Sequence, residues 1–200
     1  MSEADGPLPG GALTVTERPL DLIQLMARKG RAEALAAAIA PAFGLDLPPP
    51  GQWARSASAE AIWIAPGAWL IAAEPAAPGA LRTRVAEASE SLGAAVEQSS
   101  GRTAVRLEGA AARAVLASLC RLDLHPRSFG PQSAAATRIA HVACALRRIG
   151  DAPVFELIVA STYARWLIEE ILEAGPARGA RFAPAAAPYR SAMPAPAAHP

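Results

Sequence analysis

The chain has 200 residues, a formal net charge of +1 and 52% hydrophobic residues. That length suits one substantial domain or two small halves that share a core, and the strong burial must come from large side chains because alanine contributes little transfer free energy. No sustained basic stripe is present, which argues against a nucleic-acid surface.

Three features place the chain among cytoplasmic proteins. The N-terminal sequence carries acidic residues and no following apolar core, so we expect no signal peptide. The most apolar stretch, residues 61–73, is interrupted by a Pro-Gly pair and is too short to cross a bilayer, so we expect no membrane span. Cys120 and Cys144 lack metal-ligand spacing and are expected to be reduced, buried thiols.

The two ends differ in composition from the rest of the chain. Residues 1–12 are rich in Gly and Pro and are expected to be flexible, whereas residues 175–200 form a tail dominated by Ala and Pro. Repeated prolines lack the donors of a helix or a sheet ladder. The tail is therefore either disordered or an extended strap, which Phe182, Tyr189 and Met193 would anchor.

The first half reads as β-α-β-β-α-β. Residues 20–26 predict a strand, and apolar residues at helical spacing from Ala32 to Phe43 predict a helix with Gly44 just beyond its end. Pro41 is expected to end or bend that helix early. Two apolar runs, 61–64 and 69–73, flank a Pro-Gly turn and predict a hairpin; a helical face over 81–92 and a short strand at 94–98 follow.

The second half begins a similar series. Residues 102–107 alternate as a strand, and a helix with an apolar face follows from Ala112 to Cys120. Residues 137–146 and 154–159 predict strands paired across Gly150-Asp151, and Ser161 is a plausible N-cap for the last helix. No final strand is evident.

The predicted fold is therefore α+β, with two linked split-βαβ (ferredoxin-like) units and antiparallel or mixed sheets. The two units span about residues 20–98 and 99–174 within one domain at 13–174.

Several segments resemble the gamma subunit family of heterotetrameric sarcosine oxidase. The resemblance begins at residues 99–110, and its most specific part is Cys-Arg-Leu-Asp-Leu at 120–124, followed by Phe129 and Thr137. It covers about residues 20–172 and includes the tryptophans beside the Pro-Gly turn. One departure from the family lies at Gly130-Pro-Gln-Ser, after the phenylalanine, so that loop is expected to differ locally.

The resemblance implies an aminomethyltransferase-like fold and assembly with alpha, beta and delta subunits. It also implies that FAD, FMN, NAD and tetrahydrofolate bind mainly to the larger subunits of a complex that oxidises sarcosine to glycine. No glycine-rich nucleotide loop and no nucleophile elbow is present in this sequence, so we expect this chain alone to bind no cofactor.

Cys120, His141 and Asp123 could form a nucleophilic constellation, but a structural interpretation is stronger. Cys120 continues the apolar face of a predicted helix, and His141 lies inside a predicted strand. Asp123 follows the helix, where its carboxylate can accept backbone N–H bonds in the turn. No catalytic or metal-ligating residue is therefore predicted.

The candidate interface residues are Trp69, Arg102, Trp166, Phe182 and Tyr189. Trp63 and Trp69 fit the core best, then an interface; Trp166 lies one place off the apolar stripe of its helix and is free to meet a partner. Arg102 either pairs with Asp123 or contacts a partner. The Arg147-Arg148 pair beside a hairpin turn is interpreted as a solvated end.

The leading hypothesis is a non-catalytic accessory subunit that stabilises an assembled sarcosine oxidase by packing. One alternative is a stand-alone folate-binding or one-carbon-transfer protein, which needs a concave pocket with an acidic residue and apolar walls. Another is an accessory subunit of an oxidase for a different N-methylated amine, because substrate choice would lie on other chains.

Overall fold

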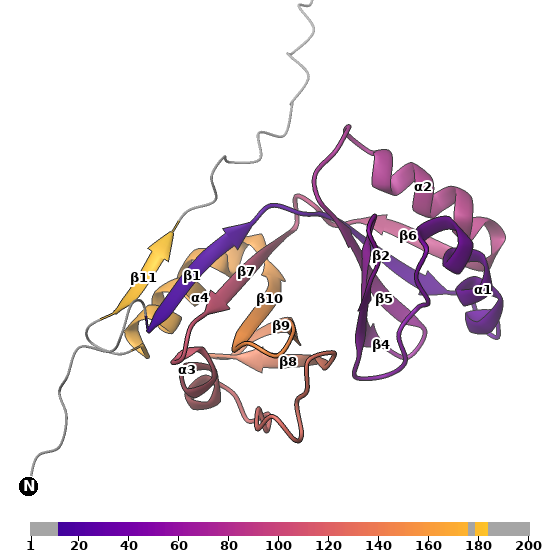
Figure 1. The fold of residues 1–200 in the computed structure, drawn as a ribbon. Coiled ribbons are helices and arrows are strands. Elements are labelled where there is room, and N and C mark those ends of the chain that lie inside the picture. Colours follow the sequence, from indigo (N-terminus) through magenta and orange to yellow (C-terminus); the bar gives the residue numbers. More distant parts are fainter. Residues whose placement is uncertain (1–11, 176–178, 184–200) are drawn as a thin grey trace, which may run out of the picture.

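The computed structural model describes residues 12–175 and 179–183, which form an α+β fold with two sheets (Figure 1). The five-stranded N-terminal sheet has the order β3-β4-β5-β2-β6, and the six-stranded C-terminal sheet has the order β11-β1-β7-β10-β9-β8. Pairing is antiparallel except between β1 and β11. The predicted fold class of two linked ferredoxin-like units is confirmed.

The N-terminal unit follows the predicted order, and its elements are β2 (Asp21–Ala27), α1 (Ala32–Phe43), β3 (Trp53–Arg55), β4 (Glu60–Ala65), β5 (Ala68–Ala73), α2 (Ala80–Ser89), a 3₁₀ turn (Glu90–Leu92) and β6 (Gly93–Glu97). Gly44 takes the predicted left-handed conformation after α1, and its N–H donates to the Ala40 carbonyl. The early end expected at Pro41 is wrong. Pro41 lies in the last turn, where its missing N–H removes only one helical bond.

The C-terminal unit contains β7 (Arg102–Glu108), α3 (Ala112–Leu119), β8 (Ala134–Ile139), β9 (Val142–Arg148), β10 (Val154–Ala160) and α4 (Ser161–Glu173). The single strand expected at 137–146 is wrong, because Ala140 and His141 form a two-residue turn between β8 and β9. Both residues have positive φ, 45° and 72°, which is the backbone of a type I′ hairpin without its usual Asn-Gly. The predicted pairing of the following strand with β10 is confirmed.

The predicted N-cap of the last helix is wrong by one residue. Its N-cap position is Ala160, and Ser161 is already helical. The Ser161 hydroxyl donates instead to the Ser100 carbonyl, 3.2 Å away, and accepts from Thr103. Ser161 therefore ties α4 to the start of β7 rather than capping the helix.

The strand missing from the second half comes from the N-terminus. Strand β1 (Leu13–Arg18) pairs with β7 and takes the place that a fourth strand occupies in a split-βαβ unit. Strand β11 (Ala180–Ala183) lies parallel to β1 at the sheet edge, beyond the predicted domain boundary at residue 174. The chain then passes from β1 directly into β2 of the other sheet, as Figure 1 shows.

Three groups of buried residues lie between the layers of helices and sheets. Helices α3 and α4 cover the outer face of the C-terminal sheet, and α1 and α2 cover that of the N-terminal sheet. The third group joins the inner faces of the two sheets and includes Leu22, Leu70 and Ile62 on one side and Ala145 and Ile158 on the other. The arrangement is α/β/β/α, and the inner layer is where the charged residues gather.

Candidate functional site

Three charged side chains lie next to one another on the inner face of the C-terminal sheet. Glu156 on β10 is paired in register with Arg106 on β7 and with Arg147 on β9. Arg106 Nη2 lies 3.1 Å from Glu156 Oε2, and Arg147 Nε lies 3.0 Å from Glu156 Oε1. The carboxylate is thus held between two guanidinium groups on its neighbouring strands.

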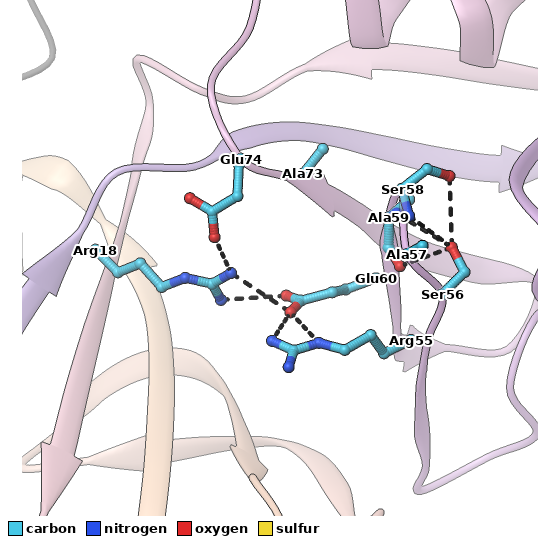
Figure 2. A pocket seen from close by; sticks show the side chains of 9 residues that line it. All are labelled: Arg18, Arg55, Ser56, Ala57, Ser58, Ala59, Glu60, Ala73 and Glu74. Atoms are coloured by element: carbon cyan, nitrogen blue, oxygen red, sulfur yellow. Dashed lines mark hydrogen bonds and ion pairs between the residues drawn. The ribbon is translucent and has the colours of Figure 1, made fainter.

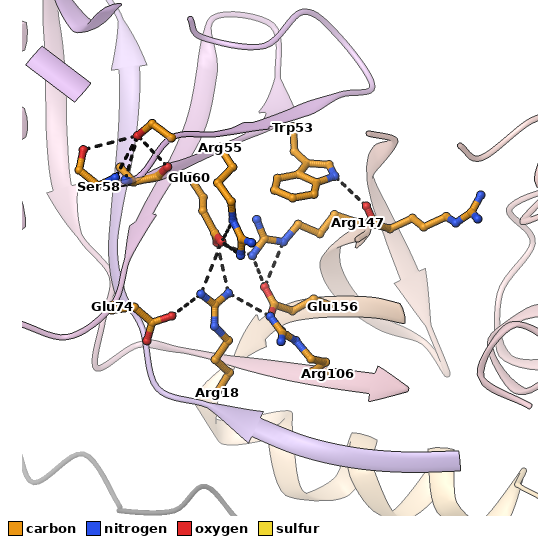
Figure 3. Close-up of polar contacts among 12 residues, drawn as sticks. Arg18, Trp53, Arg55, Ser58, Glu60, Glu74, Arg106, Arg147 and Glu156 are labelled. Atoms are coloured by element: carbon orange, nitrogen blue, oxygen red, sulfur yellow. Dashed lines mark hydrogen bonds and ion pairs between the residues drawn. The ribbon is translucent and has the colours of Figure 1, made fainter. Parts of the chain in front are cut away.

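The N-terminal sheet supplies a second carboxylate to the same group. Glu60 on β4 accepts from Arg147 Nη2 at 2.6 Å and from Arg55 Nε at 2.7 Å. Arg18, at the end of β1, lies 3.3 Å from both Glu60 Oε2 and Glu156 Oε2. Figure 3 shows the guanidinium groups converging on the two carboxylates from both sheets.

Burial makes this ion-pair cluster electrostatically strong. Arg147 and Glu156 are completely buried, and Glu60 is 4% exposed. Burial alone would raise the pKa of Glu60, but the nearby charges of Arg147, Arg55 and Arg18 outweigh it and lower that pKa to about 2. The pKa of Glu156 is also lowered: burial opposes this, and Arg147, Arg18 and Arg106 overcome it. Both carboxylates are therefore held ionised.

Trp53, on β3 of the N-terminal sheet, connects the cluster to the end of β9 in the C-terminal sheet. Its ring lies 4.6 Å from Arg147 Cζ, and its indole N–H donates to the Arg148 carbonyl at 2.7 Å. Arg147 Nη1 is buried without a hydrogen-bond partner among the described residues, and the indole ring offers the guanidinium its π face instead.

The interpretation of the Arg147-Arg148 pair as a solvated end is wrong. Arg147 is fully buried, and Arg148 is 5% exposed, with its guanidinium donating to the Phe129 and Asp151 carbonyls. Both residues are the last two of β9, and the turn follows after them. The carboxylate partners of Arg147 lie on other strands, so the local sequence gives no sign of them.

A surface hollow of about 380 Å³ opens onto one side of the cluster. Figure 2 shows Glu60 between the guanidinium groups of Arg18 and Arg55, with Glu74 bonded to Arg18. Its lining is charged side chains, serines and alanines, whereas flavin and pterin rings are usually held by apolar or aromatic walls. The hollow does not fit those cofactors, and its carboxylates are engaged rather than available as acid or base.

The residues considered as a nucleophilic constellation are only partly brought together. Cys120, which follows α3, and His141, at the β8–β9 turn, line one hollow of about 510 Å³. Asp123 instead accepts from the His125 backbone N–H at 2.9 Å, as its structural interpretation predicted. The strand position predicted for His141 is wrong. His141 lies in the turn between β8 and β9, where it is exposed.

The second cysteine is an inert thiol. Cys144 is 6% exposed, and burial raises its pKa to about 12, so it carries almost no thiolate near neutral pH. Within residues 12–175 and 179–183, no group of three or more His, Cys, Asp or Glu side chains is placed to hold a metal ion.

Two predicted interface residues take roles within this chain. Trp69 is 7% exposed, packs into the core of the N-terminal unit and donates from its indole N–H to the Pro48 carbonyl at 2.9 Å. Trp69 is therefore a core residue of this chain, as its first interpretation predicted. Arg102 is half-buried and donates to Gln98 Oε1, so the pairing with Asp123 is not formed; it also lines a hollow of about 420 Å³.

Two other predicted interface residues are exposed aromatic side chains. Trp166 on α4 and Phe182 on β11 are each 40% exposed, and Tyr163, one helical turn before Trp166, is 55% exposed. Sequence reasoning missed Tyr163, although its position three residues from Trp166 on the same helix face was a usable signal. Tyr189 lies outside the described residues. We call Tyr163, Trp166 and Phe182 the aromatic surface.

Comparison with known proteins identifies the family. A sequence model of the sarcosine oxidase gamma subunit family matches residues 29–175, well over half of the chain. The chain belongs to this family. The resemblance seen in the sequence is thereby confirmed.

Relatives in the gamma-subunit family align with most of the chain. Sarcosine oxidase subunit gamma from Arthrobacter sp. is 34% identical over 142 residues, which cover 68% of this chain and 70% of that protein. The subunit gamma of Corynebacterium sp. (strain U-96) is 38% identical over 117 residues, which cover 58% of this chain. The aligned part spans only 57% of that Corynebacterium protein.

Solved structures agree with this family and fold. A chain of the heterotetrameric sarcosine oxidase from Corynebacterium sp. U-96, in complex with pyrrole 2-carboxylate, matches with a TM-score of 0.70 and 29% identity, over 86% of this chain and 90% of that one. Aminomethyltransferase T of the Bartonella henselae glycine cleavage system matches with a TM-score of 0.61 over 86% of this chain and 48% of that one. At 17% identity the second match shows the fold alone.

Proposed function

We propose that this gamma-family chain is a non-catalytic accessory subunit of a heterotetrameric sarcosine oxidase. The observation that carries the proposal is the match to a chain of a heterotetrameric sarcosine oxidase over 86% of this one. The complex would oxidatively demethylate sarcosine to glycine in the cytoplasm. Alpha, beta and delta subunits would carry FAD, FMN, NAD and tetrahydrofolate, the last as acceptor of the one-carbon unit.

The chemistry of the described residues supports an accessory role. Glu60 and Glu156 have lowered pKa values and are enclosed by arginines, which suits a structural cluster better than proton transfer near neutral pH. The thiol of Cys144 has a raised pKa. In the described part of the chain, no helix is long and apolar enough to cross a membrane.

The aromatic surface is the proposed contact with a larger subunit. Partly exposed Trp and Tyr side chains are enriched at protein interfaces, where they bury large areas at a small entropic cost. Tyr163 and Trp166 share a helix face, and α4 lies against β11, which carries Phe182. An obligate interface buries on the order of 2,000 Å² or more, so this surface would form only its apolar centre.

Co-expression tests the accessory role. This chain, tagged, is produced together with the alpha, beta and delta subunits, and the captured complex is assayed for flavin absorbance and sarcosine oxidation. We expect one complex that contains all four chains. A chain that stays monomeric while flavin-containing subunits assemble without it would refute the proposal, as would saturable folate binding at micromolar concentration by the chain alone.

A matched pair of substitutions tests the aromatic surface. Trp166→Ser should weaken assembly by roughly tenfold or more, since truncation of a buried interface tryptophan commonly costs over 1 kcal/mol. The control is Val96→Ser, which removes an exposed apolar side chain from β6, on the other sheet. Equal assembly of Trp166→Ser and wild type, measured by quantitative pull-down, would show that the partner binds elsewhere.

A further inference from the structure

The β8–β9 hairpin is bordered by two neighbouring hollows. One, of about 420 Å³, is lined in part by Arg102 and Cys144; the other, of about 510 Å³, is lined in part by Arg121 and His141. Thr137 and Arg138 on β8 line both of them. The two hollows therefore adjoin along β8, and we treat them together as one region at the hairpin.

Every ionisable side chain that lines this region, apart from the two cysteine thiols, is basic: Arg102, Arg121, Arg138 and His141, with no carboxylate among the lining residues. Arg121, Arg138 and His141 are exposed. None of the three arginines forms an ion pair with any residue of 12–175 or 179–183, whereas most other charges near the centre of the molecule are paired. We call these four residues the cationic surface.

The backbone at the tip of the hairpin is strained. Ala140 and His141 adopt positive φ values that glycine or asparagine takes at lower cost, and such a conformation in an ordinary residue costs of order 1 kcal/mol. The Ala140 N–H is fixed to the Leu119 carbonyl at 3.0 Å, beside Cys120 and Arg121. The turn thus holds the imidazole of His141 in the lining of the region, where a glycine would relieve the strain but remove the side chain.

We propose that the cationic surface docks an acidic segment of a neighbouring subunit. This rests on the proposed accessory function and extends it by naming the chemistry of the partner. Arg121, Arg138 and His141 are exposed, and Arg102 is half-buried beside them, which suits electrostatic steering of a protein partner. A small anion would instead call for a fully buried, hydrogen-bonded charge, and none of the four basic residues here is fully buried.

Charge reversal tests the proposal. The double variant Arg121→Glu/Arg138→Glu is compared with Arg28→Glu/Arg31→Glu, which changes the net charge equally at exposed residues between β2 and α1. Association of each full-length chain with the complex formed by the other subunits is measured by surface plasmon resonance at low and high salt. We expect the first variant to associate at least roughly tenfold more slowly at low salt, with a weaker salt dependence, and the control to behave as wild type.

A third variant separates strain from recognition. His141→Gly should raise the Tm of the isolated chain, because glycine adopts this backbone without strain, and should still weaken association. The proposal is overturned if Arg121→Glu/Arg138→Glu and His141→Gly associate as wild type does while wild type assembles normally. Saturable binding of pyrophosphate to the isolated wild-type chain, lost in Arg121→Glu/Arg138→Glu, would also overturn it in favour of a small-ligand site. Failure of wild type to assemble would instead refute the accessory function.

Discussion

Glu60 forms ion pairs that connect the two sheets. It projects from β4, yet its partners Arg147 and Arg18 belong to the C-terminal sheet. Replacing a buried ion pair by apolar residues is often neutral for stability, whereas removing one partner leaves an uncompensated buried charge. The cluster therefore specifies how the sheets meet more than it adds net stability.

A neutral isostere at this position should destabilise the protein in a pH-dependent way. The folded-state pKa of about 2, against 4.5 for a free glutamate, corresponds to about 3 kcal/mol of stability from ionised Glu60. Because the folded pKa is lowered, this contribution is fully present above pH 4.5 and is lost as the pH falls toward 2. Glu60→Gln should thus unfold more easily at pH 7, and its deficit against wild type should shrink below pH 4.5.

Urea unfolding of both proteins from neutral to acidic pH measures that difference directly. Glu87→Gln, at an exposed carboxylate on α2, is the control and should match wild type within about 0.5 kcal/mol at every pH. A deficit for Glu60→Gln that stays constant between neutral and acidic pH would contradict the electrostatic account.

What the sequence could predict of this cluster was limited by distance along the chain. Arg147 reads as half of a charged pair at a turn, while its partners Glu156 and Glu60 lie 9 and 87 residues away. The burial of Trp69 was easier to predict, because its apolar neighbours already indicated a buried strand. Burial of a charge depends on partners brought together by the fold, and single-sequence patterns contain no information about that.

At the scale of elements, local signals predicted most of the N-terminal unit. The Pro-Gly turn specified the β4–β5 hairpin, and Gly44 specified the end of α1. The second unit was incompletely predicted because its fourth strand, β1, precedes the first unit in sequence. Pairing of β1 with β7 joins residues about ninety positions apart, a long-range choice that propensity does not show.

Strand β1 should therefore carry the stability of a sheet far from it in sequence. Val15 is fully buried and packs with Leu107 on the helix-covered face. Val15→Ala should cost about 2 kcal/mol, the sum of two lost methyl groups and a residual cavity. Thr16→Ala, the half-buried neighbour on the opposite face, should cost less than about 1 kcal/mol. Thermal unfolding compares the two, and equal small losses would mean that β1 is dispensable to the sheet.

At the scale of the whole molecule, the two units meet through a layer of leucines, isoleucines and alanines, one tryptophan and the ion-pair cluster. The layer between the sheets contains Ala72, Ala104 and Ala145, which let the sheets approach closely but bury little apolar area. Backbone bonds at the edge reinforce it: Trp53 N–H donates to the Gln132 carbonyl, and Ala134 N–H to the Gly51 carbonyl. Because apolar contacts are non-directional, the polar contacts fix the relative position of the sheets.

Trp53→Phe tests that conclusion against a matched substitution within one unit. Trp53 and Trp69 are buried alike and each donates its indole N–H to a backbone carbonyl, but Trp53 bonds across the two units and Trp69 within one. Each change to Phe should cost about 1–3 kcal/mol by leaving a carbonyl unpaired. Only Trp53→Phe should also speed hydrogen exchange of the Ala134 amide, because that amide bridges the units and opens when they separate locally. If Trp69→Phe speeds that exchange to the same extent, the two units open together, and the contacts of Trp53 do not govern their joining.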